Sequence, residues 1–219
     1  MNIYQKKRIV EEEGAVVSAL TSIGWTKEEL LEVVEAAVGA RRSATANHPL
    51  GTGGMRAWQD GTCRLRELGK VRGLRNDDED RIASTVDEKN KLRFIVSSGD
   101  ENTGEPNQTP QNRNKKGAGT GKTLGEAFDF YDSVLNDQAL TKTTEIEGQH
   151  TAWYLLIYCE GDTVKAEISC PDGMLDGFFT GFSERIILRN DEDSDSIVAS
   201  KSAPVPADVI DINVSRKSS

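Results

Sequence analysis

The strongest structural signal in the sequence is a pair of β-strand patterns joined by a tight turn. Residues 153–159 form an apolar run rich in strand-forming residues, and the turn Glu160-Gly161-Asp162 follows directly. From residue 163 to residue 169, apolar and polar side chains alternate. This spacing predicts an antiparallel hairpin with one solvent-exposed face that carries Lys165 and Glu167.

Helical patterns dominate the first third of the chain. Thr26 and Glu29 form a capping box, and the apolar spacing after them predicts a helix that stops at Gly39. Similar spacing predicts helices over residues 3–20, 57–74 and 123–140 and short strands over 92–96, 185–188 and 209–214. The predicted fold class is α+β, with N-terminal helices followed by a mostly antiparallel β-sheet with a packed helix.

Composition divides the chain into segments. We expect a helical N-terminal segment over 1–40, a linker or lid over 41–55 that contains Pro49 and several glycines, and an α+β domain over 56–216. Within that domain, residues 105–122 are predicted to form a flexible, exposed loop, and residues 190–207 an acidic segment.

The residue inventory excludes several classes of function. With 36% hydrophobic residues and a mean hydropathy of −0.53, no stretch is apolar enough to cross a bilayer, and the polar N-terminus does not resemble a signal peptide. We therefore expect a cytoplasmic protein. His48 and His150 are the only histidines, and three cysteines match no zinc or disulfide spacing, so histidine-based metal chemistry is nearly excluded.

Charge is unevenly distributed along the chain, whose net charge is −9. Residues 64–123 carry 13 Lys and Arg against 10 Asp and Glu, whereas residues 124–219 carry 7 against 18. If folding brings the basic segments 64–75 and 113–122 together, they form a surface that binds nucleic acid or another anion. The alternative is that these charged residues are ordinary solvent-exposed surface residues with no ligand. The candidate binding residues are Arg64, Arg66, Lys70, Arg72, Arg75, Arg113, Lys115 and Lys116.

The segment from Lys116 to Thr123 resembles the phosphate-binding loop of P-loop nucleoside triphosphatases. Glycine is missing at the first position of that motif, and no apolar strand leads into the loop. The resemblance implies a nucleotide site with ATP and Mg²⁺ as cofactors, and a flexible glycine loop is the alternative. The residues that would bind the nucleotide are Gly119, Gly121, Lys122 and Thr123.

Asp100 and Glu101 lie in an oxygen-rich turn after the strand predicted over 92–96. Such turns can hold Mg²⁺ or Ca²⁺, and a metal-dependent nuclease would use these carboxylates. No third ligand is identifiable in the sequence, so a turn closed by its own side chains is the competing interpretation.

Several segments together are similar to uncharacterised bacterial proteins carried on plasmids, phages and integrated elements. They include Leu65-Arg66-Glu67-Leu68, residues 98–104, the Lys116-Gly117 turn and Glu184-Arg185-Ile186-Ile187-Leu188, and the resemblance spans roughly residues 55–216. The resemblance implies a role in the conflict between mobile elements and their hosts, such as phage defence or its inhibition. It carries no established activity.

These patterns favour a non-enzymatic binding protein whose partner is a protein or a nucleic acid. Protein–protein interaction and nucleic-acid binding both fit the basic segments, and the nucleotide-binding or nucleotide-hydrolysing protein built on Lys122 and Thr123 is the alternative. We also expect the acidic segment 190–207 to cover the basic surface within the same chain. The patterns leave the oligomeric state and the identity of the partner open.

Overall fold

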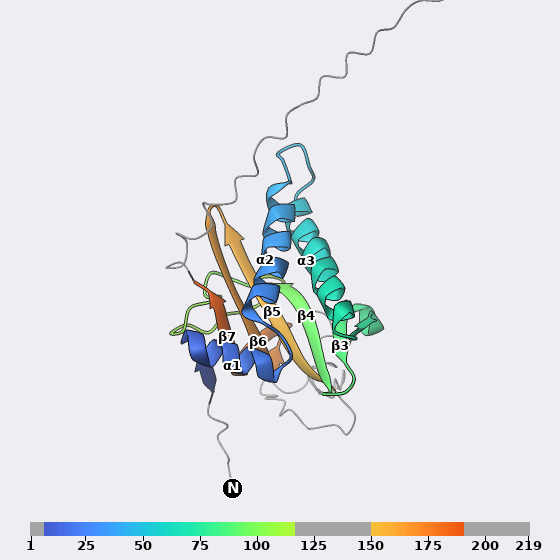
Figure 1. The fold of residues 1–219 in the computed structure, drawn as a ribbon. Coiled ribbons are helices and arrows are strands. Elements are labelled where there is room, and N and C mark those ends of the chain that lie inside the picture. The colour runs from blue at the N-terminus through green and yellow to red at the C-terminus, as the bar shows by residue number, and fades with distance from the viewer. Residues whose placement is uncertain (1–6, 117–149, 191–219) are drawn as a thin grey trace, which may run out of the picture.

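The computed structural model describes residues 7–116 and 150–190, which form one seven-stranded sheet with helices on one face (Figure 1). The strand order is β1-β7-β6-β5-β4-β3-β2. The strands are β1 (Arg8–Val10), β2 (Arg75–Asp77), β3 (Ser84–Asp87), β4 (Leu92–Ser98), β5 (Thr151–Glu160), β6 (Thr163–Leu175) and β7 (Phe178–Arg189). The helices are α1 (Glu13–Ser22), α2 (Lys27–Arg42), α3 (Thr52–Val71) and the short 3-10 helix η1 (Glu79–Arg81).

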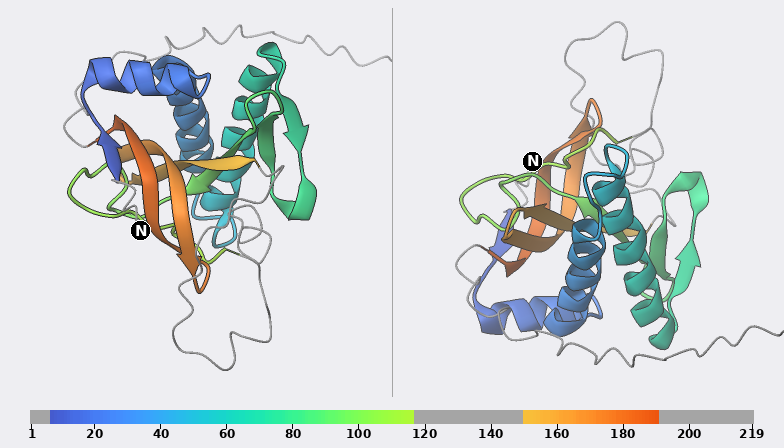
Figure 2. Two further views of the ribbon diagram at one scale, coloured as in Figure 1. Left: turned by 90° about the horizontal axis from the view of Figure 1, so that it is seen from below. Right: turned by 90° about the horizontal axis from the view of Figure 1, so that it is seen from above.

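Helices α2 and α3 lie side by side on one face of the sheet, and α1 covers its β7 end (Figures 1 and 2). The main core is formed by the apolar faces of these helices and by alternate residues of the central strands, such as Phe94, Val96 and Leu155. Because successive side chains in a strand point to opposite faces, Ile95 and Tyr154 belong to a second apolar cluster on the other face.

Several predicted elements are confirmed. The capping box at Thr26 is present: its side chain accepts a hydrogen bond from Glu29 N, and the Glu29 side chain accepts one from Thr26 N. The hairpin of β5 and β6 is antiparallel and turns at Gly161, which has a positive φ of 58°. The predicted helix 123–140 and strand 209–214 lie outside the described residues.

The α+β class is confirmed, but the predicted sheet arrangement is wrong. The sheet is mixed rather than mostly antiparallel, because β1 pairs in parallel with β7 and β4 pairs in parallel with β5. The helices are not all N-terminal either, since a strand precedes them and α3 continues to Val71, well inside the segment assigned to the α+β domain. The first predicted helix, 3–20, is replaced by strand β1 and helix α1, because β1 finds an edge partner in β7.

The connection predicted over residues 41–55 is shorter in the structure. It runs only from residue 43 to residue 51, because α2 extends to Arg42 and α3 begins at Thr52. Arg56 in α3 donates hydrogen bonds to the carbonyl and hydroxyl oxygens of Ser43, at 3.2 and 2.8 Å. These bonds join the end of α2 to α3 and close the connection.

The prediction of a solvent-exposed face on the hairpin is wrong. Glu167 is fully buried and Lys165 is 7% exposed. The segment 99–112 lies over this face: Gly104 N donates a hydrogen bond to Glu167 Oε2 at 2.8 Å, and Lys165 Nζ donates to Glu101 O at 3.0 Å. The polar loop predicted as exposed over residues 105–122 is therefore partly buried in its described part, 105–116, where Asn112 is only 1% exposed.

A glycine substitution tests how closely this segment packs. Gly104 has a φ of 77°, and an added Cβ would lie 2.7 Å from the carbonyl oxygen of Arg189. We expect Gly104→Ala to lower the free energy of unfolding by about 2–3 kcal/mol, from left-handed strain and overpacking together. Gly161→Ala is the matched control, since Gly161 has a positive φ but a Cβ added there would meet no atom within 4 Å. If urea denaturation shows that both variants lose the same free energy of unfolding, residue 104 is not closely packed.

Candidate functional site

The edge of strand β4 is left open between two neighbours. Strand β3 pairs with β4 only as far as Phe94, and the next contact along this edge is a bridge between Gly99 and Asn112. Ser98 O accepts a hydrogen bond from Arg113 N on this side, so the amide and carbonyl of Val96, two residues earlier, point to the same side. No described strand pairs with Val96 there.

A cleft of about 380 Å³ lies against this open edge. Helix α3 supplies one wall, residues 81–83 lie at one end, and Asn114 and Lys116 lie across the strand. Its lining residues are Gly54, Met55, Trp58, Arg81, Ile82, Ala83, Ile95, Val96, Ser97, Ser98, Asn114, Lys116 and Tyr154. Two further hollows share Trp58: a small one lined by Arg41 and Arg113, and a wider one lined by Arg66 and Lys70. We call the first of the three the Trp58 cleft.

Trp58 differs from the other two tryptophans in its exposure. Trp25 and Trp153 are 1% and 6% exposed and belong to the core. Trp58 is 44% exposed, and the neighbouring Met55 is 56% exposed. An exposed aromatic ring at the junction of three hollows can stack on a ligand.

Lys116 is the most unusual charged group of the cleft. Its Nζ donates a hydrogen bond to Ser97 Oγ at 2.5 Å, and burial lowers the pKa of the ammonium from 10.5 to about 8. Within residues 7–116 and 150–190, no carboxylate lies within ion-pair distance of this amine. A buried cation without a counter-charge is costly, and a bound anion would remove that cost.

Ser97 and Lys116 also resemble a catalytic pair in which a serine is the nucleophile and a lysine is its general base. An uncharged amine can accept a hydroxyl proton, and serine–lysine pairs of this kind occur in acyl transfer. Ser97, however, is only 4% exposed and lies within the regular part of β4. We therefore interpret Ser97 as the group that positions the Lys116 amine.

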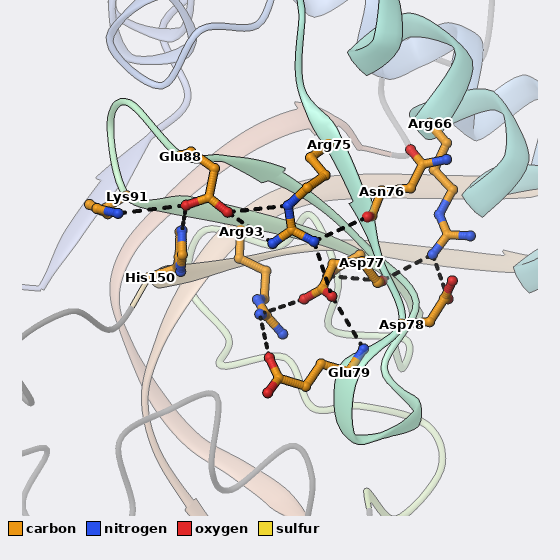
Figure 3. Close-up of polar contacts among 11 residues, drawn as sticks. Arg66, Arg75, Asn76, Asp77, Asp78, Glu79, Glu88, Lys91, Arg93 and His150 are labelled. Atoms are coloured by element: carbon orange, nitrogen blue, oxygen red, sulfur yellow. Dashed lines mark hydrogen bonds and ion pairs between the residues drawn. The ribbon is translucent and has the colours of Figure 1, made fainter.

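Most of the first predicted basic segment is neutralised by carboxylates. Figure 3 shows Arg66 paired with Asp78, and Arg75 paired with Glu88 and Asp77. Hydrogen bonds from Arg75 and His150 lower the pKa of Glu88 to about 2, as expected for a carboxylate held by cations.

Two other arginines of this basic segment are also neutralised by carboxylates. Arg64 pairs with Glu32 and Glu67, and Arg72 pairs with Glu29. Arg64, Arg72 and Arg75 are thus structural ion pairs in the described fold, whereas Arg66 and Lys70 also line the wider hollow beside Trp58. The two basic segments line different hollows around Trp58. Arg66 and Lys70 line the wider hollow, Arg113 lines the small one, and Lys116 lines the Trp58 cleft.

Two cations near Trp58 were missed by the sequence analysis. Arg41 lines the small hollow with Arg113, and Arg81 lines the Trp58 cleft with a backbone φ of 63°, which is unusual for a residue of this size. In the described part of the chain, Arg41, Arg81 and Arg113 have no carboxylate partner. Arg41 lies in the last turn of α2 and Arg81 follows an acidic turn, so no charge pattern in the sequence marks either one.

The remaining candidates from the sequence are Lys115 and the predicted nucleotide-binding residues. Lys115 is exposed and packs against Gly177. The predicted nucleotide-binding residues Gly119, Gly121, Lys122 and Thr123 lie outside the described residues, so that site stays a prediction.

The candidate metal turn is closed by its own side chains, since Asp100 Oδ1 accepts a hydrogen bond from Asn102 N at 3.2 Å. In the described ranges, no three His, Cys, Asp or Glu side chains gather as metal ligands would. Among the described helices, none has the length and apolar character that a bilayer crossing requires.

Comparison of the chain with protein-family models, with curated proteins and with solved structures found no match in any of the three. The function is therefore inferred from the Trp58 cleft and the cations around it.

Proposed function

We propose that the protein works by binding, and that it captures an anionic macromolecule at the Trp58 cleft and the hollows beside it. The observation that carries this proposal is the contrast between two sets of cations. Arg64, Arg72 and Arg75 have carboxylate partners, whereas Arg41, Arg81, Arg113 and Lys116 surround an exposed tryptophan without such partners among the described residues.

Nucleic acid is the favoured partner of the two classes that the sequence suggests. Base stacking on an aromatic ring beside cations is a common mode of nucleic-acid binding, and Trp58 supplies such a ring. An acidic protein would satisfy the cations but would leave the aromatic wall without a specific role. The net charge of −9 restricts contact with phosphates to this local surface, so we expect binding of moderate affinity that weakens with added salt.

The proposal includes no chemical step, and the role in a mobile-element or phage-defence setting stays a prediction of the sequence resemblance. A binding role needs no metal and no cofactor, and the described residues of the cleft can supply every contact that the proposal uses. Nucleotide hydrolysis with Lys122 and Thr123 remains the alternative that the sequence suggests.

A pair of double variants tests the proposal. We expect Arg41→Ala/Arg113→Ala to weaken binding of a single-stranded oligonucleotide at least about tenfold and to reduce its salt dependence. The slope of log K against log salt should fall by about 0.7 for each phosphate that the variant no longer neutralises. Fluorescence anisotropy of a labelled oligonucleotide, measured over a salt series, gives both quantities.

The matched control is Arg64→Ala/Arg75→Ala, which changes the net charge equally but removes arginines that are paired with carboxylates. We expect this control to bind nearly as the wild type does. Equal weakening by both double variants would mean that only net charge matters, and absence of any binding by the wild type would overturn the proposal. Stronger binding of an acidic peptide than of the oligonucleotide would identify a protein as the partner.

A further inference from the structure

The Trp58 cleft offers three kinds of contact that converge on one small ligand. Trp58 provides a flat apolar wall, the open edge of β4 provides the amide and carbonyl of Val96, and Lys116 provides a cation. From this arrangement we infer that the cleft holds one unstacked nucleotide, with its base against Trp58 and Val96 and its phosphate at Lys116. The inference rests on the proposed function and narrows the partner to single-stranded nucleic acid.

The size of the cleft sets the first limit. Its volume of about 380 Å³ falls at the low end of the range of small-molecule sites, roughly 300–1,000 Å³. A single base with its sugar and phosphate belongs to this size class, whereas a double helix does not enter it. A duplex could touch only the rim of the cleft.

The backbone of Val96 explains why the ligand would be a base. Adjacent donor and acceptor groups on an open strand edge match the paired donors and acceptors on the edge of a nucleobase. In a duplex these edges are hydrogen-bonded to the opposite strand and the faces are stacked. A base can therefore reach Val96 and stack on Trp58 only when it is unpaired.

Lys116 explains why the ligand would carry a phosphate. The amine lies across β4 from Trp58, is held by Ser97 at 2.5 Å, and has no carboxylate partner among the described residues. Arg81 lines the same cleft and also lacks such a partner in the ranges that the structure describes. A phosphate beside Lys116 supplies the missing counter-charge and accepts the two amine protons that Ser97 does not use.

Calorimetric titration of the full-length chain with three small ligands tests the inference. The ligands are a nucleoside 5′-monophosphate, the same nucleoside without phosphate, and ribose 5-phosphate without a base. We expect the monophosphate to bind at least tenfold more tightly than either fragment. Lys116→Met should reduce the affinity for the monophosphate toward that for the nucleoside, and Trp58→Leu should reduce it about ten- to a hundredfold, the usual effect of losing a stacking partner.

Arg64→Gln on the same helix as Trp58 is the control variant and should bind the monophosphate as the wild type does. The inference is overturned if ribose 5-phosphate binds as well as the monophosphate, or if neither variant in the cleft weakens binding. It is also overturned if a duplex competes with a labelled single strand as well as an unlabelled single strand does. Binding of the oligonucleotide without binding of the monophosphate would refute the inference and leave the proposed function standing, whereas loss of both would refute the two together.

Discussion

Replacing Glu167 with glutamine should lower the free energy of unfolding by about 3–5 kcal/mol, the usual cost of breaking a buried ion pair from one side. Glu167 is fully buried and pairs with Arg185, whose guanidinium donates to both carboxylate oxygens at 2.9 and 2.5 Å. The carboxylate also accepts hydrogen bonds from Gly104 N and Ser169 Oγ. Glutamine keeps the shape but leaves the Arg185 charge uncompensated in the interior.

The Glu167–Arg185 pair also holds the 99–112 segment against the sheet through hydrogen bonds. Arg185 donates further hydrogen bonds to the carbonyl oxygens of Gln108 and Glu105, at 2.6 and 3.0 Å. We therefore expect faster amide hydrogen exchange in this segment of Glu167→Gln, in addition to the global loss. Because the segment continues into Asn114 and Lys116, which line the Trp58 cleft, the same change should also loosen the wall of that cleft.

Urea denaturation measures the loss, and Glu88→Gln is the control. Glu88 also pairs with an arginine, Arg75, but its side chain is 50% exposed and solvent screens the pair, so its removal should cost much less stability than the removal of Glu167. If the two variants lose the same stability, the buried pair does not hold the fold in the way that the contacts indicate.

Replacing Lys116 with methionine should have the opposite sign and raise the free energy of unfolding by about 3 kcal/mol at pH 7. Burial lowers the pKa of the ammonium from 10.5 to about 8. A pKa difference of one between the folded and unfolded chains corresponds to about 1.4 kcal/mol of stability. Methionine fills similar space without a charge, so the penalty for keeping a cation in the cleft disappears.

The gain should depend on pH in a defined direction. The pKa of Lys116 is lower in the folded chain than in the unfolded chain, so between pH 8 and 10.5 the unfolded chain binds more protons and this group makes the wild type more stable as pH rises. The advantage of methionine is therefore full below about pH 8 and shrinks toward pH 10.5.

Urea denaturation at several pH values measures this dependence, and Lys115→Met is the matched control. Lys115 is exposed beside Lys116, so its replacement should change stability by less than about 0.5 kcal/mol at any pH. A Lys116→Met protein no more stable than this control at pH 7 would contradict the assigned cost. A stabilised variant that has lost monophosphate binding would mark Lys116 as a residue kept for function at the expense of stability.

Local patterns in the sequence predicted those elements that are stabilised by neighbours in the chain. The capping box at Thr26 and the hairpin turning at Gly161 depend on residues a few positions apart, and both are present. The parallel pairing of β4 with β5 and of β1 with β7 joins residues far apart in sequence, and no local pattern encodes it. For the same reason, the alternation over 163–169 predicted an exposed face that a distant segment in fact covers.

The candidate site, too, was predictable from the sequence only in part. The order of residues alone establishes which side chains carry charge. It also shows that Trp58 lies close in the chain to the first basic residues, and that Arg113, Lys115 and Lys116 form a second basic group. Which of these cations are neutralised depends on the folded chain. Arg72 pairs with Glu29 across 43 positions, whereas Arg41 and Arg113 line one hollow beside Trp58 without a carboxylate partner in the described part. The physical reason is that an ion pair depends on distances of a few ångströms in space, and sequence patterns report such distances only between near neighbours.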